Sequence, residues 1–267
     1  IIDFSVVSNP NIIGRFASLG EVNGVAVSQT SPYAFSADGL MGLASTNAAN
    51  RTAPVKADAA ALADYALNVQ LAGDYAFAAD SFGGLQVVDV SAPGSLTAVA
   101  SLLTNDVAVD VALSGNYAYL AVSLEGLFIA DISDPLNPTF AGSLGSPDLP
   151  YAVGVDVVGN YAYIAADLDG FFVVDVSNPA SPAVADSLAL ATGAAWDVDV
   201  VGSYAYLAAD DGGLKVIDIS DPNNISQVGE LTGVDLPLAL DVAVVGNRAV
   251  VAGGSDGVIV VDISTPT

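Results

Sequence analysis

The feature that most constrains this chain is a short motif that recurs at a constant interval. Four copies of Gly-x-Tyr-Ala followed by Tyr or Phe begin at Gly73, Gly115, Gly159 and Gly202. Two degenerate copies, SPYAF at Ser31 and GNRAV at Gly246, extend the series, and neighbouring anchors are 42 to 44 residues apart. A constant period of this length is typical of repeat proteins in which each unit is one supersecondary element.

A second motif, apolar-apolar-Asp-apolar-Ser, runs in phase with the first. Gly- and Asp-rich turns, such as residues 80–84 and 210–213, lie between the two motifs. The second motif is followed in most repeats by a turn with Pro, which ends a strand because Pro has no amide hydrogen to donate. Each repeat therefore predicts four short strands, the first two joined as a hairpin. The second motif ends at Ser91, Ser133, Ser177, Ser220 and Ser264.

Six such units predict a β-propeller, because a four-stranded unit of about 40 to 50 residues is the usual propeller blade. Third strands such as residues 171–174 are apolar at successive positions, which requires neighbouring blades on both faces. We therefore expect one all-β domain over residues 1–267, a six-bladed β-propeller of four-stranded antiparallel blades, with no helix beyond single turns. The blades are anchored near residues 31, 73, 115, 159, 202 and 246.

The closure of the propeller involves two similar segments. Residues 1–5 copy the second motif, but residues 258–264 are continuous with their own hairpin, so their pairing closes a shorter loop at a lower entropy cost. We expect residues 258–264 to form the third strand of the last blade. Residues 11–19 are then expected to supply its outer strand, so that an N-terminal strand closes the propeller and residues 1–5 stay outside the blade pattern.

The two motifs together resemble a known family. Gly-Asn-Tyr-Ala-Tyr, then Gly-Leu, then Val-Ile-Asp-Ile-Ser-Asp-Pro are similar to the LVIVD repeat of bacterial and archaeal proteins, over nearly the whole chain. The resemblance implies a β-propeller in a secreted or cell-surface protein, and it offers no catalytic motif. The first and sixth repeats depart from the pattern, with Ala44 in place of the motif Asp, and Arg248 and Val250 in place of the two aromatic residues.

Composition excludes several functions. A net charge of −25 repels phosphate backbones and anionic lipid surfaces, so we expect no nucleic acid partner. Without His or Cys the chain has no Ser-His-Asp triad, thiolate nucleophile or imidazole base. No apolar run approaches the roughly 18 residues of a membrane span, so we expect no direct membrane insertion, and we expect a monomer. The absence of Cys is compatible with a secreted or cell-surface location.

Residues that recur in every blade are expected to serve folding. The Asp of the second motif is expected to accept hydrogen bonds from the turn that follows it, and the paired tyrosines are expected to pack between blades. The motif aspartates are Asp89, Asp131, Asp175, Asp218 and Asp262.

Residues that break the repeat are better candidates for ligand binding. The segments leading into the first strands carry aromatic and acidic residues: Tyr65, Tyr151 and Trp196, with Asp148 and Asp235 nearby. They predict a binding face for a protein or carbohydrate ligand, through ring stacking and carboxylate contacts, although packing of these rings at the rim is the competing interpretation. The leading hypothesis is a noncatalytic binding or scaffold module.

Two further hypotheses involve carboxylates. First-strand residues expected to line the central channel include Asp110, Asp197 and Asp241, which predict either a calcium-stabilised module or carboxylates that accept amides of the adjacent blade. The other alternative is a glycoside-acting enzyme, which requires a pair of aspartates about 5 to 10 Å apart in a deep pocket.

Overall fold

The computed structural model describes residues 1–3, 11–233 and 236–266. These residues contain no α-helix, and the two helical turns defined in them are η1 (Ser123–Glu125) and η3 (Gly254–Asp256). Neither turn is long and apolar enough to cross a membrane. The prediction of an all-β fold is confirmed.

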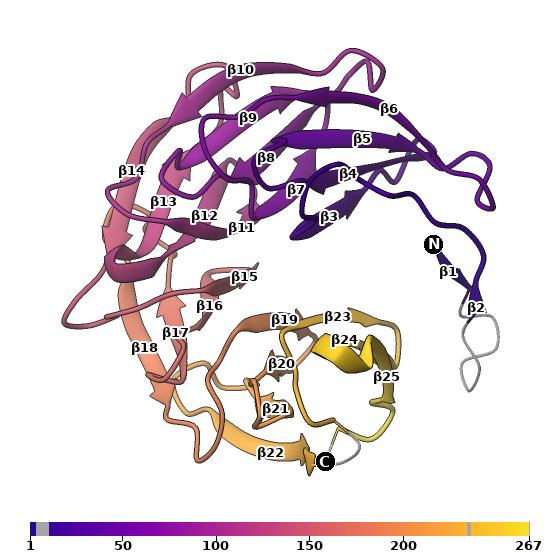
Figure 1. Cartoon of the computed structure of the whole chain (residues 1–267). Coiled ribbons are helices and arrows are strands. Elements are labelled where there is room, and N and C mark those ends of the chain that lie inside the picture. The colour runs from indigo at the N-terminus through magenta and orange to yellow at the C-terminus, as the bar shows by residue number, and fades with distance from the viewer. Residues whose placement is uncertain (4–10, 234–235, 267) are drawn as a thin grey trace. The chain divides into compact units, whose positions relative to one another are not determined.

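Besides a two-stranded sheet at the N-terminus, six sheets of three or four strands follow one another in the described residues, and each is hydrogen-bonded in sequential strand order (Figure 1). Their positions coincide with the six sequence repeats, which confirms the predicted blades. The strands of blades 1 to 3 are β3 (Gly24–Val27), β4 (Tyr33–Ala37), β5 (Leu43–Asn47), β6 (Val55–Ala60); β7 (Asn68–Ala72), β8 (Tyr75–Ala79), β9 (Leu85–Asp89), β10 (Thr97–Leu102); β11 (Ala108–Ser114), β12 (Tyr117–Val122), β13 (Gly126–Asp131), β14 (Thr139–Leu144). Those of blades 4 to 6 are β15 (Gly154–Val158), β16 (Tyr161–Ala165), β17 (Phe171–Asp175), β18 (Ala183–Leu188); β19 (Asp197–Val201), β20 (Tyr204–Ala208), β21 (Leu214–Asp218), β22 (Ser226–Leu231); β23 (Asp241–Val245), β24 (Arg248–Ala252), β25 (Val258–Asp262).

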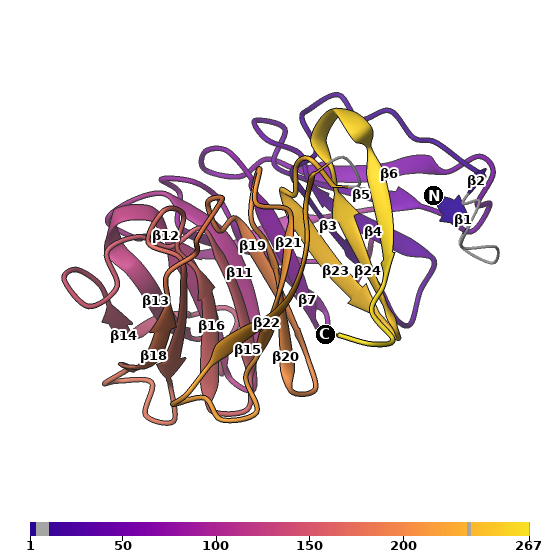
Figure 2. The same cartoon turned by 90° about the horizontal axis from the view of Figure 1, so that it is seen from below.

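The predicted outer strand over residues 11–19 does not form as expected, and the closure that it would make between the two ends of the chain stays a prediction. Blade 6 has three strands in the described residues, with β23, β24 and β25 side by side (Figure 2). β2 (Asn11–Ile12) pairs instead with β1 (Ile2–Asp3), and residues 13–19 form no strand. The N-terminal amine also donates a hydrogen bond to the Gly14 carbonyl oxygen at 2.7 Å. A hairpin closes a much shorter loop than pairing with the far end of the chain, so it costs less chain entropy.

Residue contacts divide the chain into two compact units, and the prediction of a single domain stays a prediction. Unit 1 comprises Ile1–Ala118 and Asp131–Phe140, and unit 2 comprises Tyr119–Ala130 and Ala141–Thr267. Within unit 1 the first strands β3, β7 and β11 are neighbours, and β6 and β10 lie on the opposite side of their sheets (Figure 1). Within unit 2 the first strands β15, β19 and β23 are neighbours in the same way.

Each core lies between consecutive blades. In unit 1, Phe35 and Leu43 of blade 1 are buried against Val69 and Val88 of blade 2. In unit 2, Tyr206 belongs to the core cluster that joins blades 5 and 6. Tyr119 and Tyr163 are buried as well, which supports the predicted packing role of the second tyrosine of each pair. Burial on both faces explains why the third strands are apolar at successive positions.

Candidate functional site

The candidate site is at the loop end of the blades, where the second strand turns into the third and where the next blade begins. We call the residues that precede each first strand the lead-in segment. Paired backbone hydrogen bonds join the second-to-third turn of one blade to the lead-in segment of the next, or, for Ala108, to the first residue of its first strand. These bridges pair Gly39 with Ala66, Ser81 with Ala108, Asp167 with Ala195, and Asp210 with Ala239.

Trp196 lies in such a lead-in segment and is 42% exposed. Its amide donates to the Ala208 carbonyl oxygen at 2.9 Å, and Ala195 before it is bridged to Asp167. The backbone of this residue is therefore fixed while its ring contacts solvent. Its ring can stack on a ligand. Because Trp196 is the only Trp of the chain, its fluorescence can report ligand binding.

Tyr151 and Asp148 belong to the preceding lead-in segment of unit 2. Tyr151 is partly exposed and Asp148 is exposed, so the prediction that Trp196 and Tyr151 are accessible at the loop end is confirmed. Gly154, three residues after Tyr151, lies so close to the Trp196 backbone that a Cβ there would be 2.7 Å from the Trp196 carbonyl oxygen. The two lead-in segments are thus adjacent. Their role in ligand binding stays a prediction.

The other two predicted ligand residues differ from these. Tyr65 belongs to unit 1, where its hydroxyl donates to Glu21 Oε2 at 2.6 Å and its ring lies against Gly39. The hydrogen bond to Glu21 raises the pKa of Tyr65. Asp235 lies outside the described residues. The structure therefore places Trp196, Tyr151 and Asp148 in one unit and Tyr65 in the other.

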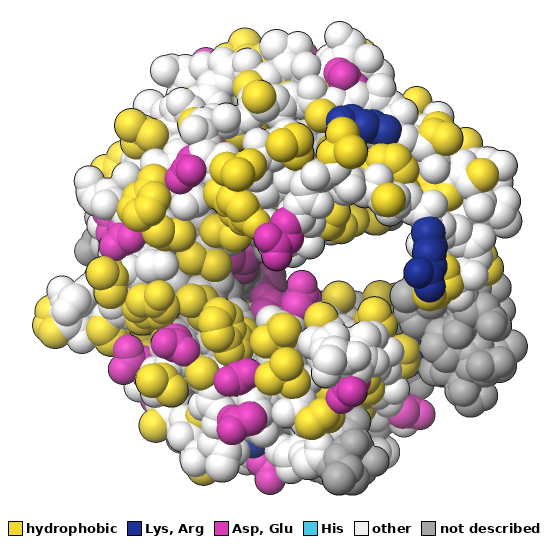
Figure 3. Space-filling model, in the orientation of Figure 1, with side chains coloured by type: hydrophobic (Ala, Val, Ile, Leu, Met, Phe, Trp, Pro, Cys, Tyr) yellow, Lys and Arg dark blue, Asp and Glu magenta, His cyan; other side chains and the backbone are white. Residues whose placement is uncertain are grey.

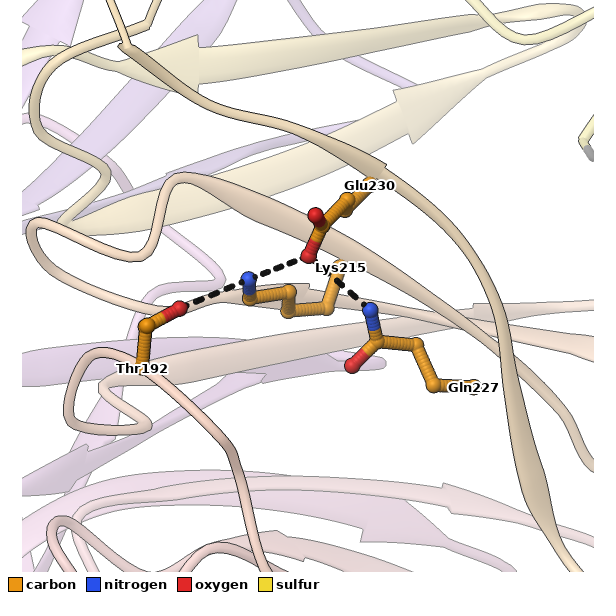
Figure 4. A network of polar contacts seen from close by, with 4 residues as sticks. All are labelled: Thr192, Lys215, Gln227 and Glu230. Carbon is orange, nitrogen blue, oxygen red and sulfur yellow. Dashed lines mark hydrogen bonds and ion pairs between the residues drawn. The ribbon is translucent and has the colours of Figure 1, made fainter.

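Lys215 is a buried basic residue whose partners the sequence analysis did not predict. Its side chain is 2% exposed, although it carries one of only five basic groups of the chain. Figure 4 shows its ammonium between two partners: Nζ lies 2.7 Å from Glu230 Oε2 and donates to Thr192 Oγ1 at 3.2 Å. Glu230 also accepts a hydrogen bond from Gln227 Nε2 at 3.1 Å. Lys215 thus links the lead-in segment of Trp196 to the outer strand β22 and lowers the pKa of Glu230.

A comparison of repeats would have revealed Lys215. Lys215 aligns with the apolar residues Phe128, Phe172 and Ile259 in blades 3, 4 and 6, and with the polar Gln86 in blade 2. A Lys at an apolar position of a repeat requires a partner specific to that blade. Glu230 and Thr192 provide it, but they are 15 and 23 residues away in sequence.

The first-strand carboxylates accept backbone amides from the next blade. Asp156 Oδ2 accepts from Val200 N at 2.8 Å, and Asp199 Oδ2 accepts from Val244 N at 2.5 Å. Asp197 repeats this contact with Val242 N at 2.9 Å. Burial raises the pKa of Asp156 and of Asp199, although the amides oppose this shift. These bonds support the interpretation that first-strand carboxylates accept backbone amides of the adjacent blade.

The predicted calcium ligands Asp110, Asp197 and Asp241 gain no geometric support from this arrangement. Asp110 is buried and accepts hydrogen bonds from Asn68 Nδ2 and Val111 N. No cluster of three or more acidic side chains in the described part of the chain is placed to hold a metal ion. The calcium hypothesis therefore stays a prediction.

Two cavities of unit 1 bear on the glycosidase hypothesis. One, of about 720 Å³, lies against blade 1 and is lined by apolar and hydroxyl side chains with Arg51, but by no Asp or Glu. The other, of about 570 Å³, has Asp74 as its one carboxylate. Neither contains the pair of carboxylates that glycoside hydrolysis requires.

The motif aspartates form the predicted local turns. In each case the Asp Oδ1 accepts the amide of the Ser two residues later, at 2.8 to 2.9 Å. The amide and hydroxyl of that Ser lower the pKa of all five aspartates. The prediction of a structural role for these residues is confirmed.

The tips of the second-to-third turns are a further feature that the sequence analysis missed. In blades 1 to 4 the tip carries a large apolar residue exposed to solvent, whereas blades 5 and 6 have Asp211 and Ser255 there. The exposed fractions are 73% for Leu40, 65% for Phe82, 67% for Leu124 and 84% for Leu168. Alignment of the six turns would have revealed this position.

Six consecutive sheets of this topology define a six-bladed β-propeller repeat protein. The architecture is similar to that of two solved structures, both with a TM-score of 0.68. One is the computationally designed Ika8 protein, at 14% identity over 91% of this chain and 71% of that chain. The other is the β-propeller domain of Cps50 (Swd1) of Myceliophteria thermophila, at 11% identity over 94% of this chain and 88% of that chain. At these identities the likeness shows the fold alone.

The repeats identify the family. Residues 63–104, 107–145, 151–189, 192–232 and 238–267 each match the LVIVD repeat, and together they make up most of the chain. The chain belongs to the LVIVD repeat family, as the resemblance of its motifs indicated. A comparison with curated proteins gave no match.

Proposed function

We propose that this chain is a noncatalytic binding module of a secreted or cell-surface protein, and that its ligand contacts the loop end of unit 2 at Trp196. The exposure of this single Trp, on a backbone fixed by hydrogen bonds, is the observation that carries the proposal. A large aromatic ring held at the surface contributes contact area at a small cost in conformational entropy. Tyr151 and Asp148, in the adjacent lead-in segment, add an aromatic and an acidic group.

The ligand is a protein or a carbohydrate. Ring stacking on Trp196 with hydrogen bonds to carboxylates suits a sugar, whereas the exposed Leu124 and Leu168 of the same unit suit an apolar protein surface. The net charge of −25 disfavours anionic glycans and nucleic acids. Neutral sugars and cationic peptides are therefore the two classes to compare.

The fluorescence of Trp196 provides the test, because no other Trp contributes to it. The protein is titrated with neutral hexasaccharides and, separately, with hexalysine, and calorimetry measures the affinity of wild type, Trp196→Ala and Phe140→Ala. Phe140 is an exposed aromatic on the outer strand β14 and serves as the control. We expect saturable binding of one class, weakened about tenfold by Trp196→Ala alone. Binding that Trp196→Ala leaves unchanged, or no saturable signal with either class, would contradict the proposal.

A further inference from the structure

A second surface, in unit 1, carries exposed apolar side chains on neighbouring loops. Leu40 and Met41 lie in the second-to-third turn of blade 1, and Phe82 lies in that of blade 2. Leu19 and Val22, which precede β3, are exposed as well. We call residues 19–22, 38–42, 61–66 and 80–84 the unit 1 loop surface.

Turn geometry holds these side chains in solvent. In blade 1 the Asp38 amide donates to the Gly42 carbonyl oxygen at 2.8 Å, and Gly42 adopts φ +77° against the outer strand. A Cβ on Gly42 would be 2.2 Å from the Ala60 carbonyl oxygen, so only Gly fits there. The turn therefore packs with its glycines and presents Leu40 and Met41 outward.

Contacts between the loops make the surface continuous. The Tyr65 ring lies against Gly39, and its hydroxyl binds Glu21. The Phe82 amide donates to Asp64 Oδ2 at 3.1 Å, and the Asp64 amide donates to the buried Asp80 at 2.9 Å. A Cβ on Gly20 would be 3.0 Å from the Met41 side chain. The apolar tips of blades 1 and 2 are thus joined through the lead-in segment between them.

Folding does not require apolar residues at these tips. Asp211 and Ser255 occupy the same position in blades 5 and 6, and both turns form. Single exposed apolar residues are common on protein surfaces, but neighbouring ones on fixed loops mark an interaction surface. The apolar tips of blades 1 and 2 therefore indicate a binding role.

The charges around these tips select the partner. Glu21 and Asp64 lie among the apolar residues, and the four segments of the unit 1 loop surface contain no Lys or Arg. On the face shown in Figure 3, Asp and Glu side chains are scattered among hydrophobic ones, and few basic side chains are visible. We propose that the unit 1 loop surface binds a basic amphipathic segment of a partner protein, with its apolar side chains on Leu40 and Phe82 and its cationic groups near Glu21 and Asp64. This site is independent of the Trp196 site.

The probe is a synthetic amphipathic peptide of Leu and Lys, with a Leu and Glu peptide of the same pattern as the charge control. The full chain is compared with Leu40→Ser/Phe82→Ser, which copies the polar tip of blade 6, and with Phe140→Ser as an exposed apolar control away from the loops. Circular dichroism checks the fold of each variant. We expect the Lys peptide to bind, with affinity reduced about tenfold or more in the double variant and unchanged in Phe140→Ser and Trp196→Ala. Added salt is expected to weaken binding.

Several outcomes would overturn this inference. Equal binding of the Glu peptide would show that charge does not select the partner. An equal loss in Phe140→Ser would show nonspecific adsorption, and binding to phosphatidylcholine vesicles without peptide binding would assign the surface to lipid. A loss in Trp196→Ala but not in Leu40→Ser/Phe82→Ser would leave the proposed function intact and refute this second site alone.

Discussion

The two partners of the Lys215–Glu230 ion pair are expected to contribute differently to stability, because they differ in exposure. Lys215 is 2% exposed, whereas Glu230 is 51% exposed. Removal of Lys215 leaves a carboxylate that water can solvate. Removal of Glu230 leaves a buried ammonium with the Thr192 hydroxyl as its other described partner. We therefore expect Glu230→Ala to destabilise the chain far more than Lys215→Met.

The magnitudes follow from the burial of Lys215. An uncompensated buried charge costs about 3–5 kcal/mol, so Glu230→Ala is expected to lower Tm by about 10 °C. Lys215→Met replaces the charge by an apolar group of similar length. Phe128 and Ile259 occupy the same position in other blades, so the site accepts apolar side chains. The expected change for Lys215→Met is within about 1 kcal/mol, of either sign.

The assay is thermal and denaturant unfolding of wild type, Glu230→Ala, Lys215→Met and the double variant. The double variant is expected to recover most of the stability lost in Glu230→Ala, because it contains no buried charge. Equal losses in the two single variants, or a double variant as unstable as Glu230→Ala, would refute the reasoning. Thr192→Val, which removes the second partner, is expected to lie between wild type and Glu230→Ala.

Two further predictions concern pH and turn geometry. Burial raises the folded-state pKa of Asp156 and Asp199, so their contribution to stability is expected to fall as the pH rises from about 4. Urea unfolding at pH 4 to 7 should therefore show wild type losing stability relative to the double variant Asp156→Asn/Asp199→Asn. A stability difference that does not depend on pH would contradict this prediction. Gly193→Ala is expected to lower Tm much more than Gly159→Ala. A Cβ at Gly193 would be 1.9 Å from the Ala209 carbonyl oxygen, whereas a Cβ at Gly159 would meet no atom within 4 Å. Both glycines have positive φ, so equal losses of Tm would show that the steric contact is unimportant.

The sequence by itself determined the features that depend on neighbours along the chain or on the repeat period. Asp175 accepts the amide of Ser177, two residues later, so its role is readable from the motif alone. The tyrosines and alternating apolar residues recur with the blade period, and the number of anchors sets the number of blades. Such features are repeated because each blade forms the same strands and packs against its neighbours in the same way.

The candidate site was predictable in part. Trp196 and Tyr151 interrupt the repeat in lead-in segments, and both have accessible side chains there. The exposed tips Leu40 and Phe82 occupy a turn position that the repeats define, but the sequence does not state which turn residues pack and which remain in solvent. Backbone conformation decides this, since Gly39 and Ser81 before the two tips, and Gly42 and Gly84 after them, all adopt positive φ.

The tertiary structure alone decided the contacts between distant residues. Asp156 accepts the amide of Val200, 44 residues away, and a sequence with one Asp on a first strand is equally compatible with a metal ligand. Lys215 is buried because Glu230 and Thr192 converge on it from another strand and a loop. Residues 11–12 pair with residues 2–3 in a local hairpin, which constrains less of the chain than a pairing of its ends would.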